Sequence, residues 1–190
     1  MATYYGYVEV PHSSYEAWRA STIGNMYDLD GWYSGQCWDY TALCYAQYGL
    51  TLYTKPGGGV ARECWTVSRS ANSRDPFESV EGVQNIKRGD ILVFGGGYAG
   101  HICFADEDYN GTNRLNCLGQ NQRGGGGGYP ATVDNINLNT FLGIFRNKNW
   151  VGDTPEPEPE KGYNKHRYNF VLFNRRKRQE KWTKKPLKRR

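Results

Sequence analysis

The chain has 190 residues and a formal net charge of +5, and aromatic residues make up 15% of it, with 15 Tyr and 6 Trp. This length suits one domain with an appendage. No stretch approaches the roughly 18 consecutive apolar residues of a membrane-spanning helix, which argues against membrane insertion, and the first residues have neither the basic nor the apolar region of a secretory signal.

The sequence predicts two helices in its first quarter. The first covers residues 14–22, with Ser13 or Ser14 as its N-cap. The second runs over residues 36–48, where no Gly or Pro interrupts it, until Gly49 stops it. The second helix is apolar nearly all round, which favours a central, buried position.

An acidic loop leads into the second helix. Asp28, Asp30 and Asp39 hold positions 1, 3 and 12 of a segment with the length of an EF-hand calcium loop. The carbonyl of Trp32 and the hydroxyl or carbonyl of Ser34 could add oxygen ligands of the kind that calcium takes. The glycine of this loop stands at position 4 instead of 6, however. The alternative is that the aspartates cap the helix and solvate a turn, with Ser34 as N-cap.

A cysteine and a histidine are candidates for catalysis. Cys37 lies in the first turn of the second predicted helix, where unsatisfied N–H groups and the helix dipole favour the thiolate. Residues 90–94 and 101–105 are predicted strands, and His101 begins the second of them. Cysteine first and histidine later is the chain order of papain-like enzymes, in which the two residues meet in space.

The strand that begins at His101 is expected to pair as a hairpin with residues 113–119, because a turn-prone segment separates them. One register sets Cys103 opposite Cys117. The five cysteines are odd in number and lack metal-site spacing, so we expect two free thiols there and no disulfide. A last strand is predicted over residues 140–146.

A Pro/Glu-rich spacer over residues 153–160 separates a domain over residues 1–152 from a basic tail over residues 161–190. The tail has 13 Lys/Arg and one acid, a net charge of +12, and the remainder has 11 Lys/Arg against 18 Asp/Glu, or −7, which together give +5. The tail could be a solvated, disordered extension, or it could bind nucleic acid or another polyanionic partner. Charge alone does not choose between them.

Four motifs resemble, in order and spacing, the CHAP domain (cysteine, histidine-dependent amidohydrolase/peptidase) of bacteriophage peptidoglycan hydrolases. They are residues 35–39 (Gly-Gln-Cys-Trp-Asp), 89–94 (Gly-Asp-Ile-Leu-Val-Phe), 100–102 (Gly-His-Ile) and 119–121 (Gly-Gln-Asn). The resemblance spans roughly residues 15–147, and the Asp-x-Asp-Gly entry is that of the calcium-binding lysin subgroup. It implies an α+β, papain-like fold in which the helix carrying the cysteine packs on an antiparallel sheet.

The resemblance also implies roles for single residues. Cys37 matches the family nucleophile, His101 the general base, and Gln36 a candidate oxyanion donor. Members of the subgroup commonly read Glu-Gln-Asn where this chain reads Gly119-Gln-Asn121. The acid that would orient the histidine is therefore missing, and Asn121 is the remaining candidate, since an amide oxygen can hold the imidazole tautomer without charge.

The function implied by the resemblance is hydrolysis of cell-wall peptidoglycan by a bacteriophage lysin, as amidase, endopeptidase or both, through a thioester. Without a visible signal, the protein would wait in the host cytoplasm for a holin or travel in the virion tail. Its basic tail would then contact phage tail proteins or anionic wall polymers. Two alternatives are a cysteine peptidase that acts on proteins and a non-catalytic wall-binding or virion structural module. The presence of both Cys37 and His101 disfavours the module.

Overall fold

The computed structural model describes residues 3–4, 12–56, 59–124 and 128–150. The chain divides into two units, Met1–Pro155 and Glu156–Arg190, and all described residues belong to the first. The expected spacer over residues 153–160 and the basic tail over residues 161–190 lie outside the described residues. Within the described part of the chain, no helix combines the length and the apolar character needed to cross a bilayer.

Capping residues mark the ends of the two longer helices. The helices are α1 (Tyr15–Thr22), α2 (Cys37–Ala46), α3 (Glu63–Thr66) and α4 (Arg69–Asn72), with 3-10 turns at Val83–Asn85 and Lys148–Trp150. The hydroxyl of Ser14 accepts a hydrogen bond from the N–H of Ala17 at 3.1 Å, so Ser14 is the N-cap of α1. Helix α2 is shorter than predicted, because Gln36 and Gln47 are its caps. The chain reverses at Gly49, whose φ of +67° suits glycine.

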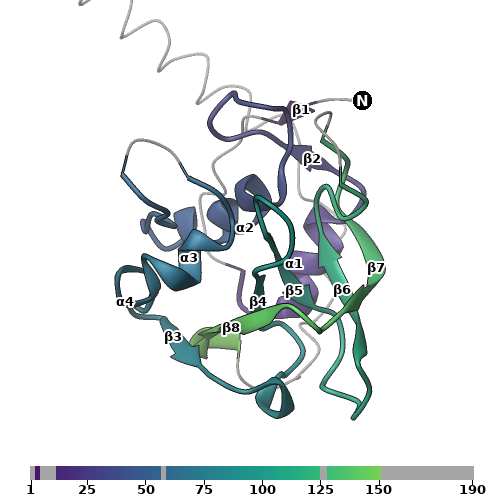
Figure 1. The fold of residues 1–190 in the computed structure, drawn as a ribbon. Coiled ribbons are helices and arrows are strands. Elements are labelled where there is room, and N and C mark those ends of the chain that lie inside the picture. The colour runs from purple at the N-terminus through teal and green to yellow at the C-terminus, as the bar shows by residue number, and fades with distance from the viewer. Residues whose placement is uncertain (1–2, 5–11, 57–58, 125–127, 151–190) are drawn as a thin grey trace, which may run out of the picture. The chain divides into compact units, whose positions relative to one another are not determined.

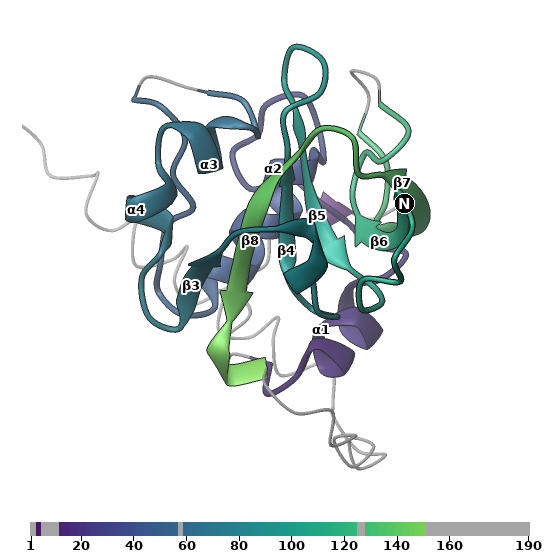
Figure 2. The ribbon, with the colours of Figure 1, turned by 60° about the horizontal axis from the view of Figure 1, so that its bottom comes forward.

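Six antiparallel strands form the main sheet, in the order β3-β8-β4-β5-β6-β7, which Figure 2 shows from left to right. The strands are β3 (Phe77–Val80), β4 (Ile91–Phe94), β5 (His101–Ala105), β6 (Arg114–Gly119), β7 (Thr132–Asn137) and β8 (Phe141–Asn147). Two short strands, β1 (Thr3–Tyr4) and β2 (Met26–Tyr27), pair in parallel as a separate ribbon. The expectation of a mixed α and β domain with an antiparallel sheet is confirmed.

The sequence predicted the four central strands and missed both edges. Strand β3 is only four residues long, and β7 carries one Asp and two Asn among its six residues. Asp and Asn are depleted in strands, and an edge strand needs less apolar surface than a central one. The tertiary pairing of β7 with β6 overrides its weak local preference.

The predicted hairpin forms, but the expected register is wrong by two residues. Phe104 pairs with Leu118 and Ala105 with Cys117. Cys103 instead lies beside Gly119, where an added Cβ would approach the Cβ of Cys103 to 2.8 Å. Because a shift of two residues preserves the alternation of side chains, Cys103 and Cys117 remain neighbours, and their thiols are free, as expected.

Both faces of the sheet are buried, and alternate residues of each central strand serve different faces. Ile102 and Phe104 of β5 join the core that contains α2, whereas Cys103 and Ala105 belong to the cluster on the opposite side. Helix α2 packs against β5 and β6 (Figure 1). This packing sets the start of α2 against the start of β5, which is His101.

Candidate active site

Cys37 is the first residue of α2, and its side chain is half-buried. Gln36 before it has an extended backbone, with φ −91° and ψ 169°. The N–H of Gln36 donates to the carboxylate of Asp39 at 2.8 Å, which ties the entering chain to the first helical turn. The thiol therefore lies at a helix N-terminus, where backbone N–H groups favour the thiolate.

Cys37 and His101 form a hydrogen-bonded pair that shifts the pKa values of both groups. Burial raises the pKa of the Cys37 thiol, but the hydrogen bond and charge of His101 outweigh burial and leave this pKa lowered. Burial likewise lowers the pKa of His101, but its contacts with Cys37 outweigh burial and leave that pKa raised. Both shifts favour a thiolate beside an imidazolium, which is the reactive state of a cysteine nucleophile.

The side-chain amide hydrogen-bonded to His101 is that of Gln122. Its Oε1 lies 3.2 Å from Nε2 of His101. The sequence had offered Asn121 for this place, and the structure instead puts the Nδ2 of Asn121 on Oε1 of Gln36, at 2.6 Å. The difference has a local cause, because Asn121 has a φ of +52° and the chain turns sharply there.

Gln36 and Asn121, two of the predicted site residues, are brought together beside the nucleophile. The Nε2 of Gln36 also donates to the carbonyl of Tyr33 at 2.5 Å. A side-chain amide carries two N–H donors, so this contact and the acceptance from Asn121 hold the amide in one orientation with a second N–H available. The role of Gln36 as an oxyanion donor stays a prediction.

Gln120 is a structural part of the site, a role that was not predicted from the sequence. It is fully buried. Its Oε1 accepts from the N–H of Tyr27 at 2.6 Å, and its Nε2 donates to the carbonyls of Tyr27 and Gln36, each at 2.9 Å. The end of β6 is thereby joined to β2 and to the residue before Cys37. Polar residues that directly follow a buried strand were the available signal for both Gln120 and Gln122.

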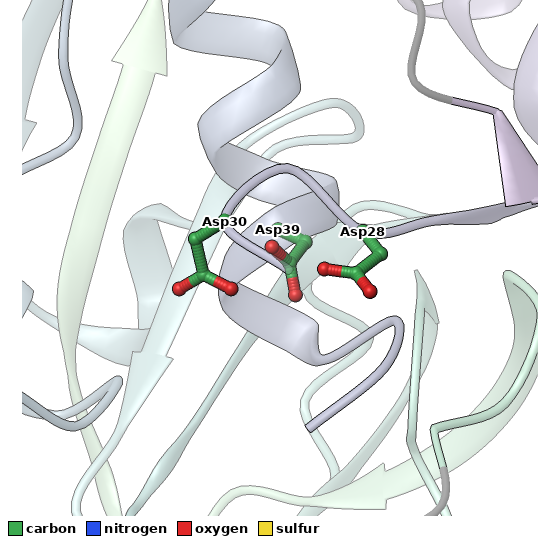
Figure 3. Close-up of side chains that lie close together, drawn as sticks. All are labelled: Asp28, Asp30 and Asp39. Carbon is green, nitrogen blue, oxygen red and sulfur yellow. The ribbon is translucent and has the colours of Figure 1, made fainter. Parts of the chain in front are cut away.

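The three aspartates of the acidic loop converge on one point, as Figure 3 shows. One carboxylate oxygen from each of Asp28, Asp30 and Asp39 lies within 4.8 Å of the others. Asp39 projects from the first turn of α2, and the other two come from the loop above it. Asp28 and Asp39 are buried, and Asp30 is exposed, so the cluster opens to solvent on one side.

The environment of Asp39 suits a cation. Burial, together with the charges of Asp30 and Asp28, raises the pKa of Asp39 to about 6, although N–H groups of Gln36 and Leu29 oppose the shift. Crowded carboxylates repel one another, and a divalent ion among them would remove that repulsion. These oxygen donors fit calcium, which accepts six to eight oxygens in flexible geometry.

The other two expected ligands, Trp32 and Ser34, are not part of this carboxylate cluster. Trp32 is 67% exposed, and the hydroxyl of Ser34 faces the sulfur of Met26 at 3.8 Å. Ser34 is not the helix cap, a position held by Gln36.

No family model matches the chain, but the chain is similar to known proteins in sequence and in structure. The chain is 31% identical over 121 residues to the D-alanyl-L-alanine endopeptidase of Streptococcus phage B30, an alignment that covers 62% of this chain and 26% of that protein. The wild-type endolysin LysIME-EF1 has a similar structure, with a TM-score of 0.55 and 25% identity, over 68% of this chain and 61% of that chain. The chain thus spans about a quarter of the length of the curated relative.

Proposed function

We propose that this chain is a bacteriophage lysin of the CHAP type, which hydrolyses peptidoglycan with Cys37 as nucleophile and His101 as base. The observation that carries the proposal is the Cys37–His101 pair, with its lowered thiol pKa at the start of a buried helix. The similarity to two phage wall-degrading enzymes supports the substrate class. The proposed fold is papain-like, with α2 on the antiparallel sheet.

The chemistry is acyl transfer in two steps. The Cys37 thiolate attacks the carbon of an amide, the C–N bond breaks, and the amine leaves with a proton from the His101 imidazolium. A thioester joins Cys37 to the acyl group. His101 then takes a proton from water, the hydroxide attacks the thioester, and release of the acid restores the thiol. The free N–H of Gln36 would stabilise the oxyanion in both steps.

The bond is proposed to be a peptide bond of the wall. The name of the phage B30 relative specifies cleavage between D-alanine and L-alanine. The same thioester chemistry would serve on the amide between the sugar and the stem peptide, so cleavage of that amide is the competing outcome. The acid side of the cut separates the two, because cleavage of the peptide bond leaves a new carboxyl group on D-alanine, whereas cleavage of the sugar–stem amide leaves sugar fragments without peptide.

Several exposed aromatic residues are close in sequence to the pair or contact a neighbouring site residue. Trp32 and Tyr33 precede Cys37 in the chain, Tyr98 precedes His101, and the carbonyl of Tyr129 accepts from the N–H of Asn121 at 3.3 Å. Flat apolar rings with polar tips suit the faces of sugars and the side chains of a stem peptide. They support a substrate that contains both sugar and peptide.

Calcium belongs to this proposal. Asp28, Asp30 and Asp39 would hold the ion, with the carbonyls of Trp32 and Ser34 completing its shell. When bound, calcium supplies positive charge that neutralises the crowded carboxylates. The chain's own contribution is structural, because Asp39 also accepts from the N–H of Gln36.

Delivery and partners are proposed from the sequence. The protein would reach the wall either from the host cytoplasm after a holin opens the membrane or as part of the virion tail. The basic segment over residues 161–190 would bind anionic wall polymers or phage tail proteins.

The direct test is loss of turbidity of purified Gram-positive walls, streptococcal walls included, with Cys37→Ser as the matched control. Clearing by the native chain and none by Cys37→Ser supports the proposal. No clearing by the native chain on any wall would contradict it and favour a non-catalytic module. Cleavage of casein without clearing would instead indicate a protein peptidase.

A further inference from the structure

The side-chain amide of Gln122 is held by three hydrogen bonds. Its Nε2 donates to the carbonyl of Cys117 at 2.6 Å and to the carbonyl of Thr132 at 2.7 Å. Its Oε1 lies 3.2 Å from Nε2 of His101. The two carbonyls belong to neighbouring strands, β6 and β7, so the amide is fixed to the sheet and not to a loop.

These contacts determine which way the amide faces. A carbonyl oxygen only accepts hydrogen bonds, so the group that faces Cys117 and Thr132 must be the NH2. The oxygen of Gln122 must then face His101, and an oxygen acceptor requires that Nε2 of His101 carry the proton. The other ring nitrogen, Nδ1, is left to exchange a proton with the thiol.

The side chain of Gln122 also fills the space beside Gly119. Gly119 has no side chain, and a Cβ added there would lie 3.4 Å from both Cδ and Oε1 of Gln122, besides meeting Cys103. The amide therefore occupies the volume in front of Gly119, beside the histidine. A carboxylate in place of this amide would set an oxygen against the two carbonyls, which repel it, so a neutral amide suits this setting.

We propose that Gln122 is the positioning residue of the Cys37–His101 pair. It holds the imidazole with its proton on Nε2 and with Nδ1 directed to the thiol, and it acts through His101 without touching substrate. The expected effect of Gln122 on turnover rests on the proposed function. Its expected effect on the Cys37 thiol and the His101 imidazole does not. The pair can therefore be tested without any wall substrate.

The test compares Gln122→Leu and Gln122→Met with the control Arg123→Leu. The first two keep the volume and remove the oxygen acceptor, while Arg123 is a neighbouring residue with a side chain 76% exposed. The first readout is the rate at which iodoacetamide alkylates Cys37, which is half-buried while the other four cysteines are buried. We expect a loss of about tenfold or more in both Gln122 variants, as for residues that orient a ligand through one contact, and none in Arg123→Leu.

The second readout is nitrogen NMR of histidine-labelled native protein, with the His101 signal assigned by comparison with His101→Ala. When the imidazole is neutral, we expect the proton on Nε2. A proton on Nδ1 would overturn the proposal even if neither Gln122 variant folds. Native alkylation rates in folded Gln122→Leu and Gln122→Met would also overturn it.

On purified walls, the Gln122 variants should lower kcat with little change in KM. If the alkylation and NMR results are as expected but the native chain cleaves no wall, the positioning role stands and the proposed function fails. The two claims are thereby separated.

Discussion

The carboxylate of Asp39 accepts a hydrogen bond from the N–H of Gln36 at 2.8 Å, and this contact joins the acidic loop to the residue directly before the nucleophile. The same carboxylate also accepts from the N–H of Leu29 at 2.9 Å. A change in the charge or position of Asp39 therefore acts on the start of α2. Under the proposed calcium site, metal binding and thiol geometry would be coupled through this one side chain.

Removal of calcium should inactivate the protein and lower its melting temperature. Binding to the native state alone stabilises by about 2.7 kcal/mol when calcium is about 100-fold above its Kd. EDTA should abolish wall clearing, and calcium should restore it better than magnesium, because the loop offers a flexible set of oxygens. The measurement is clearing and thermal melting with each ion. Asp28→Asn should lose the effect of calcium on clearing and melting, and the control Asp75→Asn, at an exposed site, should keep it. An unchanged melting temperature in EDTA would rule out a bound ion.

The alkylation of Cys37 should depend on pH through the thiol itself. The pKa of Cys37 is lowered, because His101 outweighs burial. The thiolate thus forms at a lower pH than in an ordinary cysteine. In His101→Ala, only the backbone hydrogen bonds from Ile102 and Trp38 still oppose burial, so the midpoint should move to higher pH. Rates of iodoacetamide modification from acid to alkaline pH measure both midpoints, and equal midpoints would show that His101 does not activate the thiol.

Asn121→Ala should lower turnover more than it weakens binding, because Asn121 holds the amide of Gln36 at 2.6 Å. A loss of about 10- to 100-fold in kcat is the scale for such an orienting contact. Asn121 has a φ of +52°, so alanine also adds backbone strain of about 1 kcal/mol. Asn121→Gly removes the amide without that strain and is the matched control. Native turnover in Asn121→Gly would show that Asn121 has no role in catalysis.

Deletion of residues 161–190 should leave cleavage of soluble wall fragments unchanged and weaken action on intact walls or association with the virion. The deleted segment carries a net charge of +12, and it acts over a Debye length of roughly 8 Å at physiological salt. Pull-down of both forms on walls at low and high salt, and their recovery from purified particles, measure the effect. Equal behaviour in every assay would make the segment a dispensable extension.

The sequence sufficed for the parts of the fold with strong local signals. Helix α2 was predictable because a mostly apolar segment without Gly or Pro ends before Gly49, and β5 because a continuous apolar run follows His101. Both place a candidate catalytic residue at the first position of an element. The pairing of Cys37 with His101 also followed from chain order, since the papain-like arrangement brings the two together in space.

The rest depended on contacts that no local pattern contains. The hairpin register follows from the close approach of Cys103 to Gly119, which is a tertiary contact. The choice of Gln122 over Asn121 follows from the turn at Asn121 and from two carbonyls on different strands. Neither could be read from the run Gly-Gln-Asn-Gln, in which three adjacent amides compete for the same histidine.

Cysteine-dependent hydrolysis is tested most directly by mass spectrometry of the soluble fragments released from purified peptidoglycan by the native chain and by Cys37→Ser, with calcium present. We expect the native chain to add one water across a single kind of amide bond, and Cys37→Ser to release nothing while melting at a similar temperature. Release of the same fragments by Cys37→Ser would contradict a cysteine mechanism. Absence of fragments with folded, calcium-loaded native protein would contradict hydrolysis itself.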